Sequence, residues 1–200
     1  MIEHLEVLVE EPSAEAALRV LLPRYLQDVT FEVYPHQGKG DLLNKLPQRL
    51  RGYAAWLPEN WRIVVLVDRD DDDCVELKRR MEEFVSTSGL WIRSSRSTNR
   101  AVVNRIAVEE LEAWYFGDWD AVREVFPKVS ATVSAQSAYR DPDAISGGTW
   151  EAFERILQAG GYMEGGLRKT EAARAIAAHL IPERNTSRSF QSFWSGIMSQ

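Results

Sequence analysis

The feature that most constrains the fold is an almost unbroken apolar run at residues 62–67, Arg-Ile-Val-Val-Leu-Val, which leads directly into the acidic run Asp-Arg-Asp-Asp-Asp-Asp at 68–73. Runs rich in β-branched residues, without polar alternation, are typical of strands that are covered on both faces, as in parallel sheets. Ligands of open parallel sheets collect outside the carboxyl ends of the strands. The run therefore predicts a central parallel strand that delivers acidic side chains to a ligand-binding edge.

Strands and helices alternate through the first half of the sequence. Three further strands are predicted at Leu5–Val9, Thr30–Tyr34 and Val102–Val108. Helices are predicted at Ala14–Leu26, Leu42–Leu57 (bent or broken near Pro47), Val75–Val85 and Glu109–Phe116. This order predicts an α/β fold with a mainly parallel sheet of about four strands and helices on both faces.

The second half contains no strong strand pattern. Helical stretches are predicted near Trp119–Phe126, Thr149–Ala159 and Thr170–Leu180, separated by glycine pairs. We therefore expect residues 1–117 to form the α/β core and residues 118–200 to form a helical and loop extension packed on that core.

Composition narrows the class of protein. The chain has 200 residues, 44% of them hydrophobic, and a net charge of −6, which does not favour a broad basic surface for a nucleic-acid backbone. Cys74 is the single cysteine, so neither an intramolecular disulfide nor a cysteine zinc site can form, and a reducing cytosol is the expected compartment. No run approaches 18 apolar residues, so no membrane-spanning segment is expected.

Two acidic groups follow predicted strands. Glu10 ends the first strand, and Asp68 and Asp70 end the third. If these two strands are neighbours, the three carboxylates would converge, and hard oxygen ligands of this kind suit Mg²⁺ or Mn²⁺. The alternative is that such acids only cap helices, which we expect of Asp72 or Asp73 before the helix at Val75.

Other candidate residues are less specific. Glu109 and Glu112, after the fourth strand, share one face of the predicted helix, although they could simply form a solvated first turn. Lys39, Arg96 and Lys169 are candidate phosphate contacts, with solvated loops as the alternative.

An acidic residue after the first strand, followed by Asp-x-Asp after the third, resembles the Toprim fold of topoisomerases, primases and OLD-type nucleases. The chain more closely resembles the bacterial domain-of-unknown-function family 4276, which is regarded as Toprim-like. The matching segments span most of the chain: residues 9–15, 67–70, 106–114 with the core Glu-Leu-Glu-Ala-Trp, 173–177 and 189–190. Glu11 stands where that family usually has glycine.

The resemblance implies Mg²⁺-dependent phosphodiester chemistry, namely the hydrolysis of nucleic acid by water, and an ATPase partner in mobile-element defence. Glu10 would act as a general base or metal ligand, Asp68 and Asp70 would hold the metal, and Glu112 or Glu109 would complete the pocket. Two alternatives stay open. The chain could be a non-catalytic Toprim-like interaction subunit, or a phosphatase that uses an aspartyl nucleophile.

Overall fold

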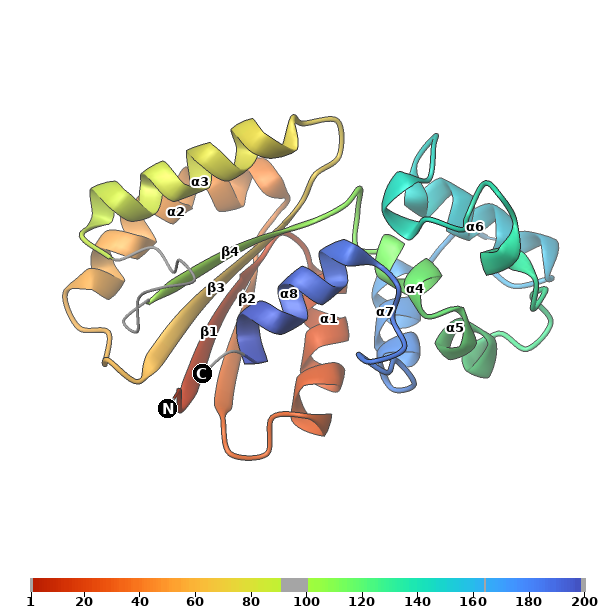
Figure 1. The fold of residues 1–200 in the computed structure, drawn as a ribbon, viewed down its shortest axis with the longest axis horizontal. Helices are drawn as coiled ribbons and strands as arrows, with labels where there is room; N and C mark the ends of the chain where they lie inside the picture. Colours follow the sequence, from red (N-terminus) through yellow and green to blue (C-terminus); the bar gives the residue numbers. More distant parts are fainter. Residues whose placement is uncertain (1, 91–100, 164, 199–200) are drawn as a thin grey trace.

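A four-stranded parallel sheet forms the centre of the computed structural model, which describes residues 2–90, 101–163 and 165–198 (Figure 1). The strands are β1 (His4–Val9), β2 (Thr30–Pro35), β3 (Trp61–Asp68) and β4 (Val102–Ala107). Their order is β2-β1-β3-β4, and every neighbouring pair is parallel. The predicted α/β class is confirmed, and β1 and β3 are neighbours, as a shared acidic site requires.

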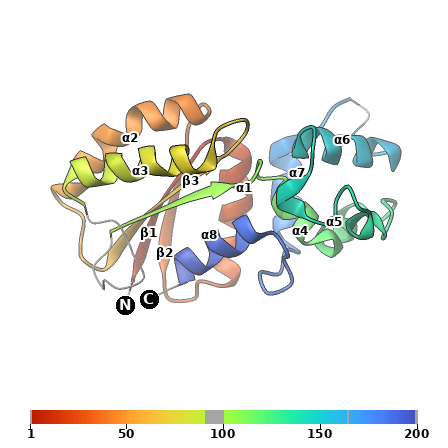
Figure 2. The same cartoon turned by 45° about the horizontal axis from the view of Figure 1, so that its top comes forward.

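Helices cover both faces of this sheet (Figures 1 and 2). They are α1 (Pro12–Leu21), α2 (Lys39–Ala54) and α3 (Cys74–Ser88). Successive strand side chains point to opposite faces. Val7 and Val9 of β1 therefore join the hydrophobic cluster under α1, whereas Leu8 joins the cluster under α2 and α3. This double burial explains why the strand sequences are apolar without alternation.

The chain after β4 is helical and returns to the sheet. Its helices are α4 (Ala113–Gly117), α5 (Trp119–Val125), α6 (Thr149–Ala159), α7 (Lys169–Ala177) and α8 (Arg188–Met198), with short 3-10 turns at Val133–Ala135 and Pro142–Ala144. Another 3-10 turn, Leu22–Arg24, follows α1 in the first half. Helix α7 packs on α1, and α8 packs on β4. One hydrophobic cluster contains side chains from both halves, so the boundary after residue 117 stays a prediction.

Several predicted element boundaries differ from the structure. The helix expected at 109–116 begins only at Ala113, because a Glu110 oxygen accepts hydrogen bonds from Trp150 N and Thr149 Oγ1, both at 3.0 Å, and so caps α6 instead. Helix α2 begins at Lys39 and continues through Pro47 without a break. Helix α8 was not predicted at all. No described helix is long and apolar enough to cross a membrane.

Asp118 joins three segments of the C-terminal half. It is 1% exposed, and its carboxylate accepts hydrogen bonds from Ile181 N at 2.8 Å and from Arg184 Nε and Nη2 at 2.6 and 3.0 Å. The same carboxylate accepts from Ala121 N at 3.4 Å and caps α5. A buried carboxylate bound in this way fixes the loop after α7 against α5.

We expect Asp118→Ala to lower the free energy of unfolding by about 3 kcal/mol or more, because it leaves the donors of Ile181 and Arg184 without their buried partner. Urea denaturation followed by circular dichroism measures this change. The control is Asp120→Ala, an exposed residue 3.9 Å from the same arginine, which should cost under about 0.5 kcal/mol. Equal losses in the two variants would contradict the anchoring role of Asp118.

Candidate functional site

The candidate site lies where β1, β3 and β4 end, at the carboxyl edge of the sheet. Glu10 follows β1 and accepts a hydrogen bond from Asp68 N, with 3.1 Å between Glu10 Oε2 and that nitrogen. Burial raises the pKa of Glu10 despite this hydrogen bond, and the charge of Asp70 adds to the rise. The structure therefore brings Glu10 and Asp68 together, as the sequence predicted for neighbouring strands.

Asp68 is a carboxyl whose charged form is disfavoured both by burial and by its acidic neighbours. Burial raises its pKa well above the ordinary value, and the charges of Glu10, Glu112, Glu11 and Asp70 raise it further, in that order. No hydrogen bond or ion pair joins its carboxylate to another of the described side chains or amides. The Asp68 carboxyl group therefore lies among other carboxylates and is either negatively charged or protonated.

Asp70 is ion-paired with a lysine at the same edge of the sheet. Its carboxylate lies 2.7 Å from Lys39 Nζ, which also contacts Asp72 at 2.7 Å and donates to the carbonyl of Arg69 at 2.8 Å. Burial disfavours the charge of Lys39, but its hydrogen bonds to the two aspartates outweigh burial and raise its pKa. Asp70 also has a positive φ of 48°, which turns the loop over the strand end.

Glu112 enters the site from the turn before α4. Glu112 is 1% exposed, and its Oε2 atom has no hydrogen-bond partner among the described residues. Burial raises its pKa to about 7; Lys169 opposes the rise, while Glu110 and Glu11 add to it. A buried carboxyl with a free oxygen and acidic neighbours is a residue that a cation would stabilise.

Tyr115 is a site residue that the sequence did not single out. Its side chain is 2% exposed, and its hydroxyl has no hydrogen-bond partner in the described part of the chain. Burial raises its pKa, and the charges of Glu112, Glu11 and Asp68 raise it further, so the phenol faces the carboxylates. The available signal was its spacing of three residues from Glu112, which places both on one helical face.

Lys169 is the cation that the C-terminal half contributes. It is the first residue of α7 and is half-buried, with its Nζ atom 5.1 Å from the centre of the Trp150 ring. Burial opposes its charge, yet Glu112, Glu11, Glu110 and Asp68 together raise its pKa. It makes no ion pair within 4.0 Å with any described residue, so its ammonium group lies near the carboxylates without being bound to one.

Two other acidic residues near this edge, Asp73 and Glu109, make different contacts. Asp73 caps α3 by accepting a hydrogen bond from Glu76 N at 2.8 Å, which confirms the capping role predicted for Asp72 or Asp73. Glu109 lies 3.8 Å from Arg69 Nη2, and its Oε2 atom has no hydrogen-bond partner among the described residues. Glu109 therefore belongs to the same edge but is tied to an arginine rather than to Asp68.

The predicted metal ligands do not form a complete metal-binding site among the described residues. Across residues 2–90, 101–163 and 165–198, no three His, Cys, Asp or Glu side chains already stand close enough to hold a metal ion. Arg96, a predicted phosphate contact, lies outside the described residues.

Comparisons with known proteins gave one match. The family model described as "Domain of unknown function (DUF4276)" matches residues 9–198. Neither the search of curated proteins nor the search of solved structures returned a match.

We expect stability to fall with rising pH through the titration of Glu112. Its folded pKa of about 7 exceeds the ordinary value of 4.5, so between these values the unfolded chain loses the proton first and the folded state is penalised. Glu112→Gln removes this penalty. The free energy of unfolding of this variant should be about equal to that of wild type near pH 4.5 and about 3 kcal/mol higher than that of wild type near pH 8.

Urea titrations at the two pH values measure the difference. Glu124→Gln, an exposed carboxyl on α5, is the control and should follow the wild-type profile. A Glu112→Gln variant whose pH profile runs parallel to wild type would show that Glu112 does not titrate between these values.

Proposed function

The chain belongs to the DUF4276 family, and from the geometry of its strand-end carboxylates we propose that it is a Toprim-like, Mg²⁺-dependent phosphodiesterase that cleaves nucleic acid. One observation carries the proposal: Asp68 lies among Glu10, Asp70 and Glu112 without a hydrogen-bond donor to its carboxylate from any described residue. Such an arrangement is destabilising unless a cation or protons balance the charge.

The residues present fit a hard divalent cation. Carboxylate oxygens are the ligands that Mg²⁺ prefers, and Mg²⁺ typically takes only one or two of them, with water and substrate phosphate completing its coordination. Asp68 and Asp70 would hold the ion, and the unpartnered Oε2 atom of Glu112 supplies a further donor at the same edge. When bound, the ion would stabilise charge on the attacked phosphate and help to generate the nucleophile.

The remaining steps fall to side chains of this protein. Glu10, whose pKa is raised by burial, is suited to accept the proton of the attacking water, because a base works best with a pKa close to the operating pH. Lys39 and Lys169 flank the carboxylates and would contact substrate phosphate. Tyr115 is 2% exposed and therefore cannot reach a nucleic-acid strand as a nucleophile, which favours hydrolysis by water.

The competing proposal is a Toprim-like subunit that binds an ATPase partner and has no catalysis of its own. It is favoured by two observations: among the described residues no three His, Cys, Asp or Glu side chains stand close enough to hold a metal ion, and Asp70 is already ion-paired with Lys39. The two proposals differ in whether metal binding is accompanied by cleavage, so one set of variants tests both.

The decisive experiment is a calorimetric titration with Mg²⁺ and Mn²⁺, combined with cleavage assays on single-stranded DNA, duplex DNA and RNA. The double variant Asp68→Asn/Asp70→Asn should lose specific metal binding and reduce cleavage about 100-fold or more. Asp28→Asn/Asp120→Asn makes the same change of charge at exposed positions and should leave both unchanged.

Metal binding without cleavage of any of these substrates would support the non-catalytic subunit. Equal metal affinity in wild type and the Asp68→Asn/Asp70→Asn variant would contradict the metal site itself.

A second prediction concerns Lys169 as a substrate contact. Lys169→Gln should raise KM for the cleaved substrate about 10-fold or more, as expected for the loss of one charge-assisted contact to phosphate. Its Mg²⁺ affinity should not weaken, because the variant removes a competing positive charge. Lys128→Gln is the matched control, since Lys128 Nζ also lies over an aromatic ring, 5.7 Å from the centre of the Tyr162 ring. An unchanged KM in Lys169→Gln would exclude this role.

A further inference from the structure

A second pocket lies on the face of the sheet that α2 covers, toward the end opposite the carboxylates. It has a volume of about 560 Å³, which falls in the range of small-molecule sites. We call it the α2–sheet pocket and define it by Arg49 and Tyr53 of α2, Trp56 just after α2, Tyr34 of β2 and Trp61 of β3. Trp61 is the first residue of β3, whereas the carboxylate of Asp68 belongs to its last residue.

The end of α2 forms one wall of the pocket. Arg49, Gly52 and Tyr53 are three or four positions apart, so they lie on one face of the helix. Trp56 continues this wall from the turn that follows, where its backbone nitrogen donates to the carbonyl of Tyr53 at 3.1 Å. Gly52 leaves a gap between these side chains, because a Cβ atom at that position would have no neighbouring atom within 4 Å.

Trp56 presents the most accessible aromatic ring of the pocket. It is 55% exposed, and its ring centre lies 5.4 Å from that of Tyr53 and 5.7 Å from that of Trp61. Tyr34 and Trp61 are partly exposed as well. Aromatic rings that are held in place by one another and remain accessible favour a planar ligand that can stack on them.

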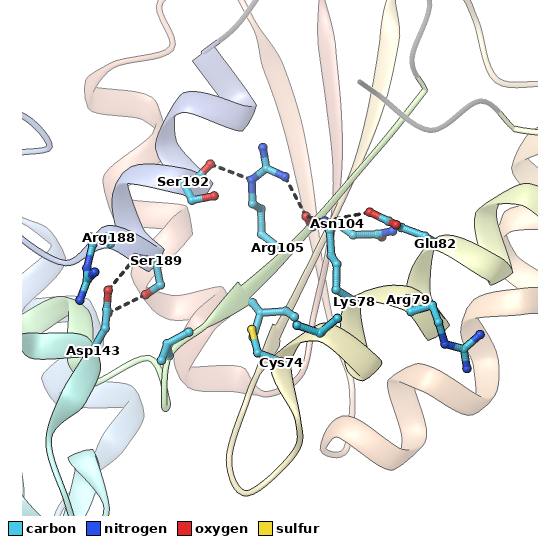
Figure 3. Close-up of a pocket in the computed structure, with 13 residues that line it drawn as sticks. Cys74, Lys78, Arg79, Glu82, Asn104, Arg105, Asp143, Arg188, Ser189 and Ser192 are labelled. Atoms are coloured by element: carbon cyan, nitrogen blue, oxygen red, sulfur yellow. Dashed lines mark hydrogen bonds and ion pairs between the residues drawn. The ribbon is translucent and has the colours of Figure 1, made fainter. Parts of the chain in front are cut away.

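Arg49 is a partly exposed cation whose N–H groups have neither a hydrogen-bond acceptor nor an ion-pair partner in the described part of the chain. Its guanidinium carbon lies 5.4 Å from the centre of the Tyr34 ring. By contrast, Lys78, Arg79 and Arg188, which line a cavity between α3, β4 and α8, each pair with a carboxylate (Figure 3). Arg49 is therefore available to donate hydrogen bonds to a ligand.

The two carboxylates of the lining are already engaged. Glu6 is buried; it accepts a hydrogen bond from Tyr53 Oη at 2.5 Å and lies 2.9 Å from His4 Nε2. Glu32 lies 3.1 Å from Arg19 Nη2. Both carboxylates nevertheless add negative charge to the pocket.

This negative charge decides which acceptor suits Arg49. Burial raises the pKa of Tyr34, the charges of Glu6 and Glu32 add to the rise, and Arg49 opposes it, so these charges act on one region. A phosphate would be repelled by the two carboxylates, whereas the carbonyl oxygen and ring nitrogen of a base are uncharged. The pocket therefore favours an uncharged planar ligand with acceptor atoms along one edge.

We infer that the α2–sheet pocket binds a guanine base, either of a free nucleotide or of an unpaired position in a nucleic-acid strand. The base stacks on Trp56, and Arg49 donates to its O6 and N7 atoms, which is the commonest specific contact between a side chain and a base edge. Adenine fits less well, because it carries an amino group where guanine has O6. This site needs no metal ion and none of Glu10, Asp68 or Asp70.

The test is a calorimetric titration of the full chain in EDTA with GMP, IMP, AMP and ribose 5-phosphate. IMP keeps the O6 and N7 atoms of guanine and lacks only its 2-amino group, so it should bind within about 3-fold of GMP. AMP should bind about 10-fold more weakly than GMP, or weaker still. Ribose 5-phosphate, which has no base, should not bind.

Four variants separate the contributions of stacking and hydrogen bonding. Trp56→Ala should weaken GMP binding about 10-fold or more, and Gly52→Leu should weaken it by placing a side chain in the gap. Arg49→Met should remove the preference for GMP over AMP. Arg51→Met makes the same substitution at an exposed position of α2 and should bind like wild type. Circular dichroism establishes that each variant is folded.

Two further probes identify the source of the base and test the opposite charge. A short oligo(dT) with one central guanine that binds more tightly than GMP identifies a strand as the ligand, whereas tighter binding of GMP identifies a free nucleotide; both outcomes support the site. Choline is the other probe, because aromatic rings beside carboxylates also hold quaternary ammonium groups. Choline binding as tight as that of GMP overturns the proposal in favour of a cationic ligand.

Three other results overturn the guanine site. They are equal affinity for GMP and AMP, GMP binding that survives both Trp56→Ala and Gly52→Leu, and a folded wild-type protein that binds neither GMP nor the oligonucleotide. The same titration in Asp68→Asn/Asp70→Asn should be unchanged, so failure of the metal site is distinguishable from failure of this pocket.

Discussion

The parallel pairing of β1 with β3 is the constraint on which the candidate site depends. It places the carboxyl ends of two strands side by side, and the Glu10 carboxylate bonds to the backbone nitrogen of Asp68 as a consequence. β4 pairs with β3 on the other side and brings the turn that carries Glu112 to the same edge. A different strand order would separate these carboxylates, however acidic the sequence.

Concentrating carboxylates at one edge works against the stability of the fold. The pKa values of Glu10, Asp68 and Glu112 are all raised, which shows that burial and mutual repulsion disfavour their charged forms. Lys39 and Lys169 supply positive charge from two different sides. A bound cation would offset the same repulsion. The repulsion among the carboxylates therefore explains both their raised pKa values and the metal binding that we propose.

The C-terminal half contributes to the site as well as covering the sheet. Lys169 begins α7, which packs on α1, and its position near the carboxylates depends on that packing. The hydroxyl of Tyr115 on α4 faces the same group of acids. The proposed catalytic edge is thus built from both halves of the chain, although its acidic residues all come from the first 112 positions.

The sequence alone determined the alternation of strands and helices. Strands buried on both faces of a sheet have continuous apolar runs, and such runs can be recognised in the sequence without knowledge of distant contacts. It also placed Glu10, Asp68 and Asp70 at strand ends, since a strand stops where polar residues begin. It could not indicate that Asp70 would bond to Lys39, that residues 109–112 would form a turn, or that α8 would pack along β4. Those outcomes depend on contacts between residues far apart in the chain, such as Glu110 with the start of α6, which only the tertiary structure decides.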